Sequence, residues 1–92
     1  MEAVARNERS RIVRAAKEKV ASIEKEIVAA EHRLDEIDAR LADQATYQTE
    51  GLARTLGDER KSIQVDLSRL NRRWEEMASR LAEVEEEPGP SS

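Results

Sequence analysis

The sequence predicts an all-α protein in which two long helices form an antiparallel coiled-coil hairpin. Apolar residues recur every three or four positions over two long stretches, and the heptad phase is lost between them. The 92 residues include only three glycines and two prolines, and aromatic residues make up 2% of the chain against 39% charged residues. So little aromatic bulk argues against a sandwich or an α/β nucleotide-binding fold, and the length allows one small domain.

The N-terminal segment, residues 1–9, is expected to form a basic arm that frays. Arg6 and Arg9 fall on positions that the apolar pattern would assign to the seam between the helices. Because arginine is seldom buried without a partner, we expect the seam to end near Ile12 and the hairpin to cover residues 10–87.

The first helix is predicted for about residues 10–43. Residues 10–41 contain neither glycine nor proline, and every a and d position of four heptads is aliphatic or alanine. These seam positions are Val13, Ala16, Val20, Ile23, Ile27, Ala30, Leu34, Ile37 and Leu41.

The turn is predicted for about residues 44–52, and the second helix for about 53–87. The second seam consists of Leu56, Arg60, Ile63, Leu67, Leu70, Trp74, Met77, Leu81 and Val84. Gly57 is expected to weaken the start of this helix, and Pro88 to end it before a flexible tail over residues 88–92. Trp74 is expected to pack between the helices. Tyr47 in the turn either packs on the seam or contacts a partner.

The charge pattern favours pairing of the two helices within one chain. Net charge is positive over residues 6–19, negative over 24–38, positive over 54–73 and negative over 75–87. An antiparallel hairpin brings opposite blocks together, whereas a parallel dimer brings like blocks together. A register shifted by one heptad matches the charges about as well, but it leaves Leu56 without a partner. If Leu41 lies opposite Leu56, the register places Val13 opposite Val84. It also puts Arg33 beside Asp66, Arg40 beside Glu59, and Lys19 beside Arg80 as the one mismatch.

The residues show no catalytic constellation, and we expect no enzymatic activity, no metal site and no cofactor. There is no cysteine, and the only histidine, His32, falls on an outward-facing position. A hairpin offers no pocket that could tune a catalytic carboxylate. No apolar run approaches the length of a membrane span, and no signal peptide is recognisable, so we expect a cytoplasmic protein without membrane contact.

Basic residues suggest a surface that contacts phosphates. Arg54, Lys61 and Arg72 lie within about 20° of one another around the second helix, and Arg69 about 60° away. Arg11 and Arg14 belong to a second basic block in the first helix. Such residues could track a nucleic-acid backbone, although Asp58 and Glu76 interrupt the stripe and the net charge is −4.

Two motifs carry a family resemblance over roughly residues 20–84: Leu41-Ala42-Asp43 followed by Tyr47, and Arg72-Arg73-Trp74-Glu75-Glu76-Met77. They resemble the C-terminal domain of ABC-F proteins of the Uup type, which are soluble tandem ATPases. Gln44 departs from the family's usual proline, and Met77 from its leucine. The resemblance implies a coiled-coil hairpin that binds DNA or ribosomal RNA, with the ATPase domains elsewhere in the parent protein. The basic residues are not part of the shared motifs.

The main alternative is a coiled-coil spacer or protein-interaction domain with no role in nucleic-acid binding. A partner would then dock on outward apolar positions such as Val28, Leu52 and Val65. Self-association into a four-helix bundle belongs to this alternative, because a two-helix hairpin of this size is marginally stable. We therefore expect a monomer or a weak homodimer. An aminoacyl-tRNA synthetase arm or a small enzyme of the chorismate mutase kind fits less well.

Overall fold

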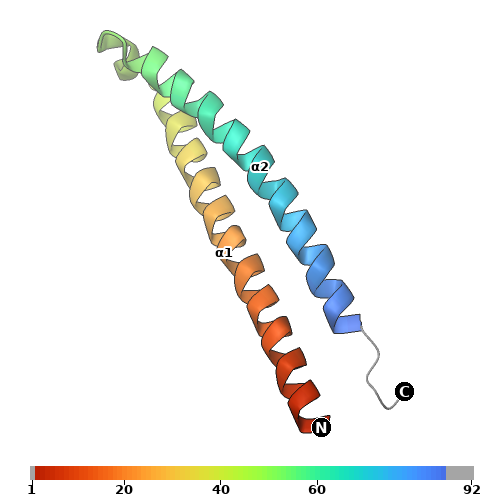
Figure 1. Cartoon of the computed structure of the whole chain (residues 1–92). Coiled ribbons are helices and arrows are strands. Elements are labelled where there is room, and N and C mark those ends of the chain that lie inside the picture. Colours follow the sequence, from red (N-terminus) through yellow and green to blue (C-terminus); the bar gives the residue numbers. More distant parts are fainter. Residues whose placement is uncertain (1, 87–92) are drawn as a thin grey trace.

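The computed structural model is a hairpin of two long antiparallel helices joined by a short tip (Figure 1). Helix α1 spans Glu2–Ala42, the 3-10 helix η1 spans Gln44–Gln48, and helix α2 spans Leu52–Glu86. The structure describes residues 2–86, with side chains from Arg6 onward. The molecule measures 69 × 16 × 15 Å, which confirms the predicted all-α hairpin. None of the described helices has an apolar stretch long enough to cross a membrane.

The N-terminal boundary of α1 lies before the predicted start of the first helix at about residue 10. The helix begins at Glu2, so residues 2–9 are helical. These residues contain no glycine or proline, and a helix already nucleated by the seam extends easily through them. At the other end of the hairpin, α2 runs from Leu52 to Glu86, against predicted bounds of about 53 and 87. The tail predicted for residues 88–92 lies outside the described residues.

The seam between the helices contains the least exposed side chains. Ile37, Leu56 and Ile23 are 0%, 2% and 4% exposed, and the other predicted seam residues are half-buried, with one exception. The exception is Trp74, which is 36% exposed where the sequence predicts a ring packed between the helices. Two helices cover only one side of so large a ring, and no third helix of the described chain covers the other.

The register is visible at the open end and near the tip. Val13 and Val84 line the same cavity, in agreement with their predicted opposition. Near the tip, Arg60 Nε donates a 2.6 Å hydrogen bond to Asp38 Oδ1 across the hairpin. This bond explains how an arginine occupies a seam position: the side chain is half-buried, and its charged group is paired with a carboxylate.

Side chains hold the tip by bonding to backbone atoms. Asp43 caps η1, its Oδ1 accepting a 3.0 Å hydrogen bond from the Ala45 backbone amide. Thr46 is 5% exposed, and its hydroxyl donates to the Arg40 carbonyl at the end of α1. Tyr47 donates from its hydroxyl to the Leu41 carbonyl at 2.8 Å. The Leu41 carbonyl at the helix end thereby gains a side-chain partner, and the Arg40 carbonyl accepts from Thr46 in addition to the Asp43 backbone amide.

The two described glycines in and after the tip give opposite predictions for replacement by alanine. Gly51 has φ +77°, so Gly51→Ala should destabilise the hairpin by about 1 kcal/mol. Gly57 lies within α2, and a Cβ there meets nothing within 4 Å, so Gly57→Ala should stabilise it by about 1 kcal/mol. Thermal unfolding followed by helical circular dichroism measures both. Shifts of the same sign would contradict this assignment.

Candidate nucleic-acid interface

The predicted basic stripe lies on the outer face of α2. We call Arg54, Lys61, Arg69 and Arg72 the α2 stripe; all four are exposed. They lie about half a turn around the helix from seam residues such as Leu56 and Ile63, so they face away from α1. At 1.5 Å per residue, the stripe extends for about 27 Å along the helix.

The stripe residues are free to meet a ligand. Within residues 2–86, none of the four makes an ion pair or a side-chain hydrogen bond. By contrast, Lys17, Arg33 and Arg60, which point across the hairpin, all have carboxylate partners. The chain therefore uses several inward cations to join its helices and leaves the α2 stripe in solvent, where counterions occupy it until a polyanion displaces them.

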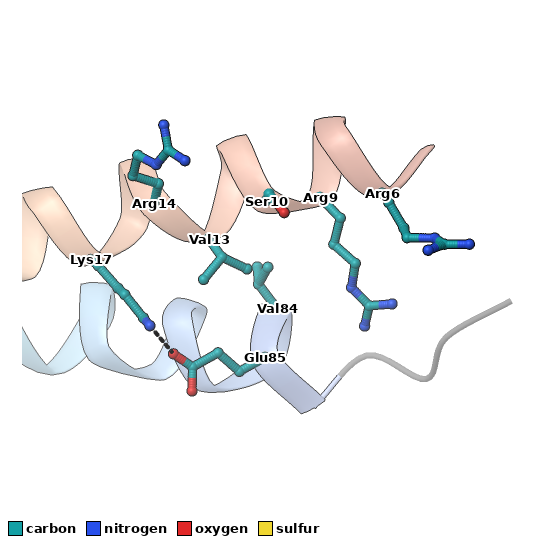
Figure 2. A pocket seen from close by; sticks show the side chains of 8 residues that line it. All are labelled: Arg6, Arg9, Ser10, Val13, Arg14, Lys17, Val84 and Glu85. Carbon is teal, nitrogen blue, oxygen red and sulfur yellow. Dashed lines mark ion pairs between the residues drawn. The ribbon is translucent and has the colours of Figure 1, made fainter. Parts of the chain in front are cut away.

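Arg11 and Arg14 do not join the α2 stripe. They lie on the other helix, near the open end, and both are exposed. Arg14 lines an open-end pocket of about 570 Å³ together with Arg6, Arg9, Ser10, Val13, Lys17, Val84 and Glu85. Figure 2 shows Arg14 pointing away from α2 while Arg9 extends toward its end. The predicted site residues therefore form two separate groups.

The open-end pocket includes three cations that the prediction of the site left out, namely Arg6, Arg9 and Lys17. Arg9 is half-buried, as its seam position predicts, whereas Arg11 and Arg14 are exposed. Lys17 Nζ lies 3.9 Å from Glu85 Oε1, so the acidic end of α2 neutralises part of this pocket (Figure 2). The sequence does contain a signal for Arg6 and Arg9. When the heptad pattern is extended toward the N-terminus, it places both on the side that faces α2.

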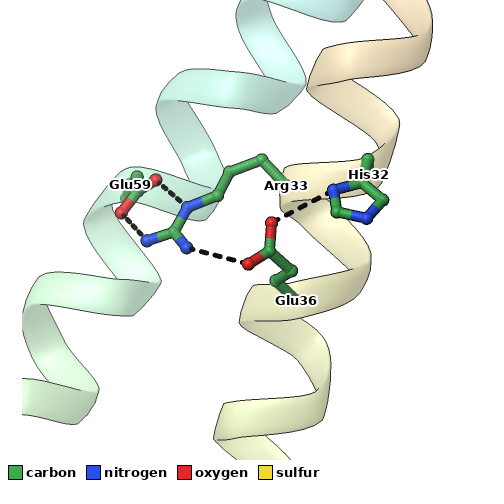
Figure 3. Close-up of polar contacts among 4 residues, drawn as sticks. All are labelled: His32, Arg33, Glu36 and Glu59. Carbon is green, nitrogen blue, oxygen red and sulfur yellow. Dashed lines mark hydrogen bonds and ion pairs between the residues drawn. The ribbon is translucent and has the colours of Figure 1, made fainter.

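A network of side chains joins the middle of the two helices. Arg33 forms a bidentate pair with Glu59, with Nε to Oε2 at 2.6 Å and Nη2 to Oε1 at 2.9 Å (Figure 3). On α1, Glu36 lies 3.7 Å from Arg33 and 3.1 Å from His32. The predicted charge pairs were Arg33 with Asp66 and Arg40 with Glu59, so the observed bond corrects the partner of Arg33. The long arginine and glutamate side chains bridge the axial offset and gain two parallel hydrogen bonds.

The Arg33–Glu59 pair predicts how stability responds to acid. The hydrogen bond from Arg33 lowers the pKa of Glu59 below its ordinary value. A lowered folded pKa gives stability that is present above the unfolded value and is lost as pH falls through the folded one. Glu59→Gln should therefore lower the Tm at pH 7, and the difference from wild type should shrink near pH 3, below the ordinary pKa of glutamate at about 4.3. A difference independent of pH would contradict this role.

Tyr47 presents its ring at the tip. The ring is 61% exposed although its hydroxyl is bonded to the Leu41 carbonyl. The tyrosine therefore serves the fold through its hydroxyl while most of its surface faces solvent, and a contact with a partner at this position stays a prediction. Elsewhere in the described part of the chain, no three histidine, aspartate or glutamate side chains converge to hold a metal ion.

Comparison with known proteins places these features in one family. A sequence model described as ABC transporter C-terminal domain matches residues 12–79, well over half of the chain. The match includes the tip and the α2 stripe, and it begins one residue after Arg11. No curated protein and no solved structure shows significant similarity to the chain.

Proposed function

The chain belongs to the family of ABC transporter C-terminal domains, and from this premise we propose that it is an accessory domain that binds nucleic acid. In this proposal the α2 stripe contacts phosphates of DNA or ribosomal RNA. The ATPase domains of the parent protein supply nucleotide hydrolysis, and this domain acts by binding. The observation that carries the proposal is the set of four exposed cations on one helix face, none with an intramolecular partner among the described residues.

The dimensions of the stripe suit a phosphate backbone. Its length of about 27 Å corresponds to about eight phosphates of one DNA strand, at about 3.4 Å per phosphate along the axis. Gaps of seven, eight and three residues separate successive stripe cations. Contacts of this kind would position the domain on a nucleic acid without reading its sequence. We therefore expect binding that tolerates changes of base sequence.

The test measures binding of the 92-residue chain by fluorescence anisotropy. The probes are a labelled DNA duplex of about 20 base pairs, which is longer than the stripe, and a labelled structured RNA. The test variant replaces all four stripe residues by glutamine. The matched control replaces four other exposed cations by glutamine and has the same net charge; its positions are Lys19, Lys25, Arg40 and Arg80. We expect the stripe variant to lose binding and the control variant to keep most of it.

Equal losses in the two variants would show that overall charge, and not the stripe, governs binding. No binding of the wild-type chain to either probe at low salt would refute the proposal for this domain. The spacer or protein-interaction function would then be the better account of an acidic hairpin with a net charge of −4.

A further inference from the structure

A shallow apolar groove lies between the helices near their open end. It has a volume of about 290 Å³ and is lined by Ile12, Ala15, Ala16, Lys19, Met77, Arg80 and Val84. Lys17 of the open-end pocket and Lys19 of this groove lie about 160° apart around α1, so the two hollows open on different sides of the seam. The two hollows share only the seam residue Val84, and the nucleic-acid proposal does not use the groove.

The apolar floor of the groove is incompletely covered. Ile12 is 56% exposed, and Met77 and Val84 are only half-buried. No seam residue from Val13 to Val20 is fully buried, whereas Ile23, Ile37 and Leu56 are nearly inaccessible. The open half of the hairpin consequently has a partly exposed apolar strip, with its residues three or four positions apart. A third helix could cover such a strip.

Two cations of like charge stand at the rim of this strip. Lys19 comes from α1 and Arg80 from α2, and both are exposed. Neither forms an ion pair or a side-chain hydrogen bond within the described residues. The equivalent heptad positions nearer the tip hold the bonded pair of Arg33 and Glu59. At the groove, no carboxylate of the described residues pairs with the two cations of the rim.

The charges of the rim indicate what would cover the groove. A second copy whose two-fold axis passes through the groove would set Lys19 and Arg80 against the same two cations, which is unfavourable. A helix with an apolar stripe flanked by carboxylates would instead cover Ile12 and Met77 and neutralise the rim. We infer that this groove binds an acidic amphipathic helix of a protein partner, which completes a three-helix bundle.

The first experiment uses two labelled three-heptad peptides with leucine at a and d. The acidic peptide has glutamate at every e and g position, and the basic peptide has lysine there. Repulsion between like charges keeps each peptide from pairing with itself. Fluorescence anisotropy with the 92-residue chain should show binding of the acidic peptide, and affinity for the basic peptide lower by more than about tenfold, because like-charge contacts oppose docking.

Charge reversal separates a specific contact from a loss of folding. The double variant with Lys19→Glu and Arg80→Glu should prefer the basic peptide, and helical circular dichroism checks that it stays folded. The double variant with Lys25→Glu and Arg40→Glu changes the net charge equally at exposed positions outside the groove, and it should keep the preference for the acidic peptide.

Ile12→Ser should weaken binding of the acidic peptide by about tenfold or more, as expected for loss of a buried anchor. Val28→Ser is the matched control, since Val28 is 66% exposed and does not line the groove. It should leave the affinity unchanged.

Three outcomes would overturn the inference. Equal affinity for the two peptides would remove the role of the rim, and equal effects of Ile12→Ser and Val28→Ser would remove the role of the floor. Sedimentation equilibrium showing a homodimer that Ile12→Ser abolishes would mean that a second copy covers the groove. None of these outcomes bears on the α2 stripe, so the nucleic-acid proposal can fail or succeed independently.

Discussion

Leu56→Ala should abolish cooperative folding of the hairpin. Leu56 is 2% exposed and lies at the start of α2, opposite the end of α1. Truncating a buried leucine costs about 2–5 kcal/mol, because the lost contacts leave a cavity. Small domains have only about 5 kcal/mol of stability or less, and only three apolar side chains among the described residues are fully buried here. We therefore expect a broad, low-temperature loss of helical circular dichroism in place of a sharp transition.

Two control variants make this prediction specific. Val28→Ala removes methyl groups from a side chain that is 66% exposed, and should change the stability by less than about 0.5 kcal/mol. Leu56→Met keeps most of the volume and should cost less than about 1.5 kcal/mol. If Leu56→Ala and Val28→Ala melt alike, the seam near the tip does not carry the stability of the hairpin.

The affinity for duplex DNA should fall about 100-fold between 50 and 200 mM monovalent salt. Each phosphate contact contributes about −0.9 to the slope of log affinity against log salt, so four contacts give a slope of about −3.6. Single-stranded nucleic acid should show a shallower slope of about −2.8 and a loss of about 50-fold over the same range. Anisotropy titrations at four or more salt concentrations measure both slopes.

The single stripe variants refine this result. Replacing any one of Arg54, Lys61, Arg69 and Arg72 by glutamine should reduce the magnitude of the slope by about one, since each removes one phosphate contact. A wild-type slope near zero would show that any binding is not electrostatic. A wild-type slope that persists unchanged in the four-residue variant would show that other cations, such as those of the open-end pocket, make the contacts.

The positions of the α2 stripe residues were predictable from the sequence, because the helical period alone places them on one face. Residues 54, 61 and 72 share a face of any continuous helix, no proline lies between them, and α2 continues through Gly57. The open-end pocket was less predictable, because it depends on how far α1 extends. In the sequence, Arg6 and Arg9 are charged residues at positions where the seam pattern predicts apolar ones. In the structure α1 continues through both, and they line one pocket with Val84 and Glu85.

The ion pairs show why the contacts between the two helices could not be predicted without the folded chain. The sequence allows Arg33 to meet either Asp66 or Glu59, since both lie one residue before a seam position on the second helix. Only the axial offset and the reach of the side chains select Glu59, with two hydrogen bonds. Thr46 likewise carries no pattern in the sequence, and its burial follows from the path of the tip.

The fold class, the antiparallel pairing and the members of the α2 stripe were predictable from the sequence alone. These follow from the heptad spacing, the alternating charge blocks and the 3.6-residue period, all of which are local properties of the chain. The folded chain was needed to show that Trp74 is 36% exposed and that Arg33 pairs with Glu59. The predicted register already set Lys19 beside Arg80, and the structure adds that both line an open apolar groove. The reason is that the exposure of a side chain and the choice of its partner depend on how the two helices pack and on the axial offset between them. No single stretch of sequence encodes this packing.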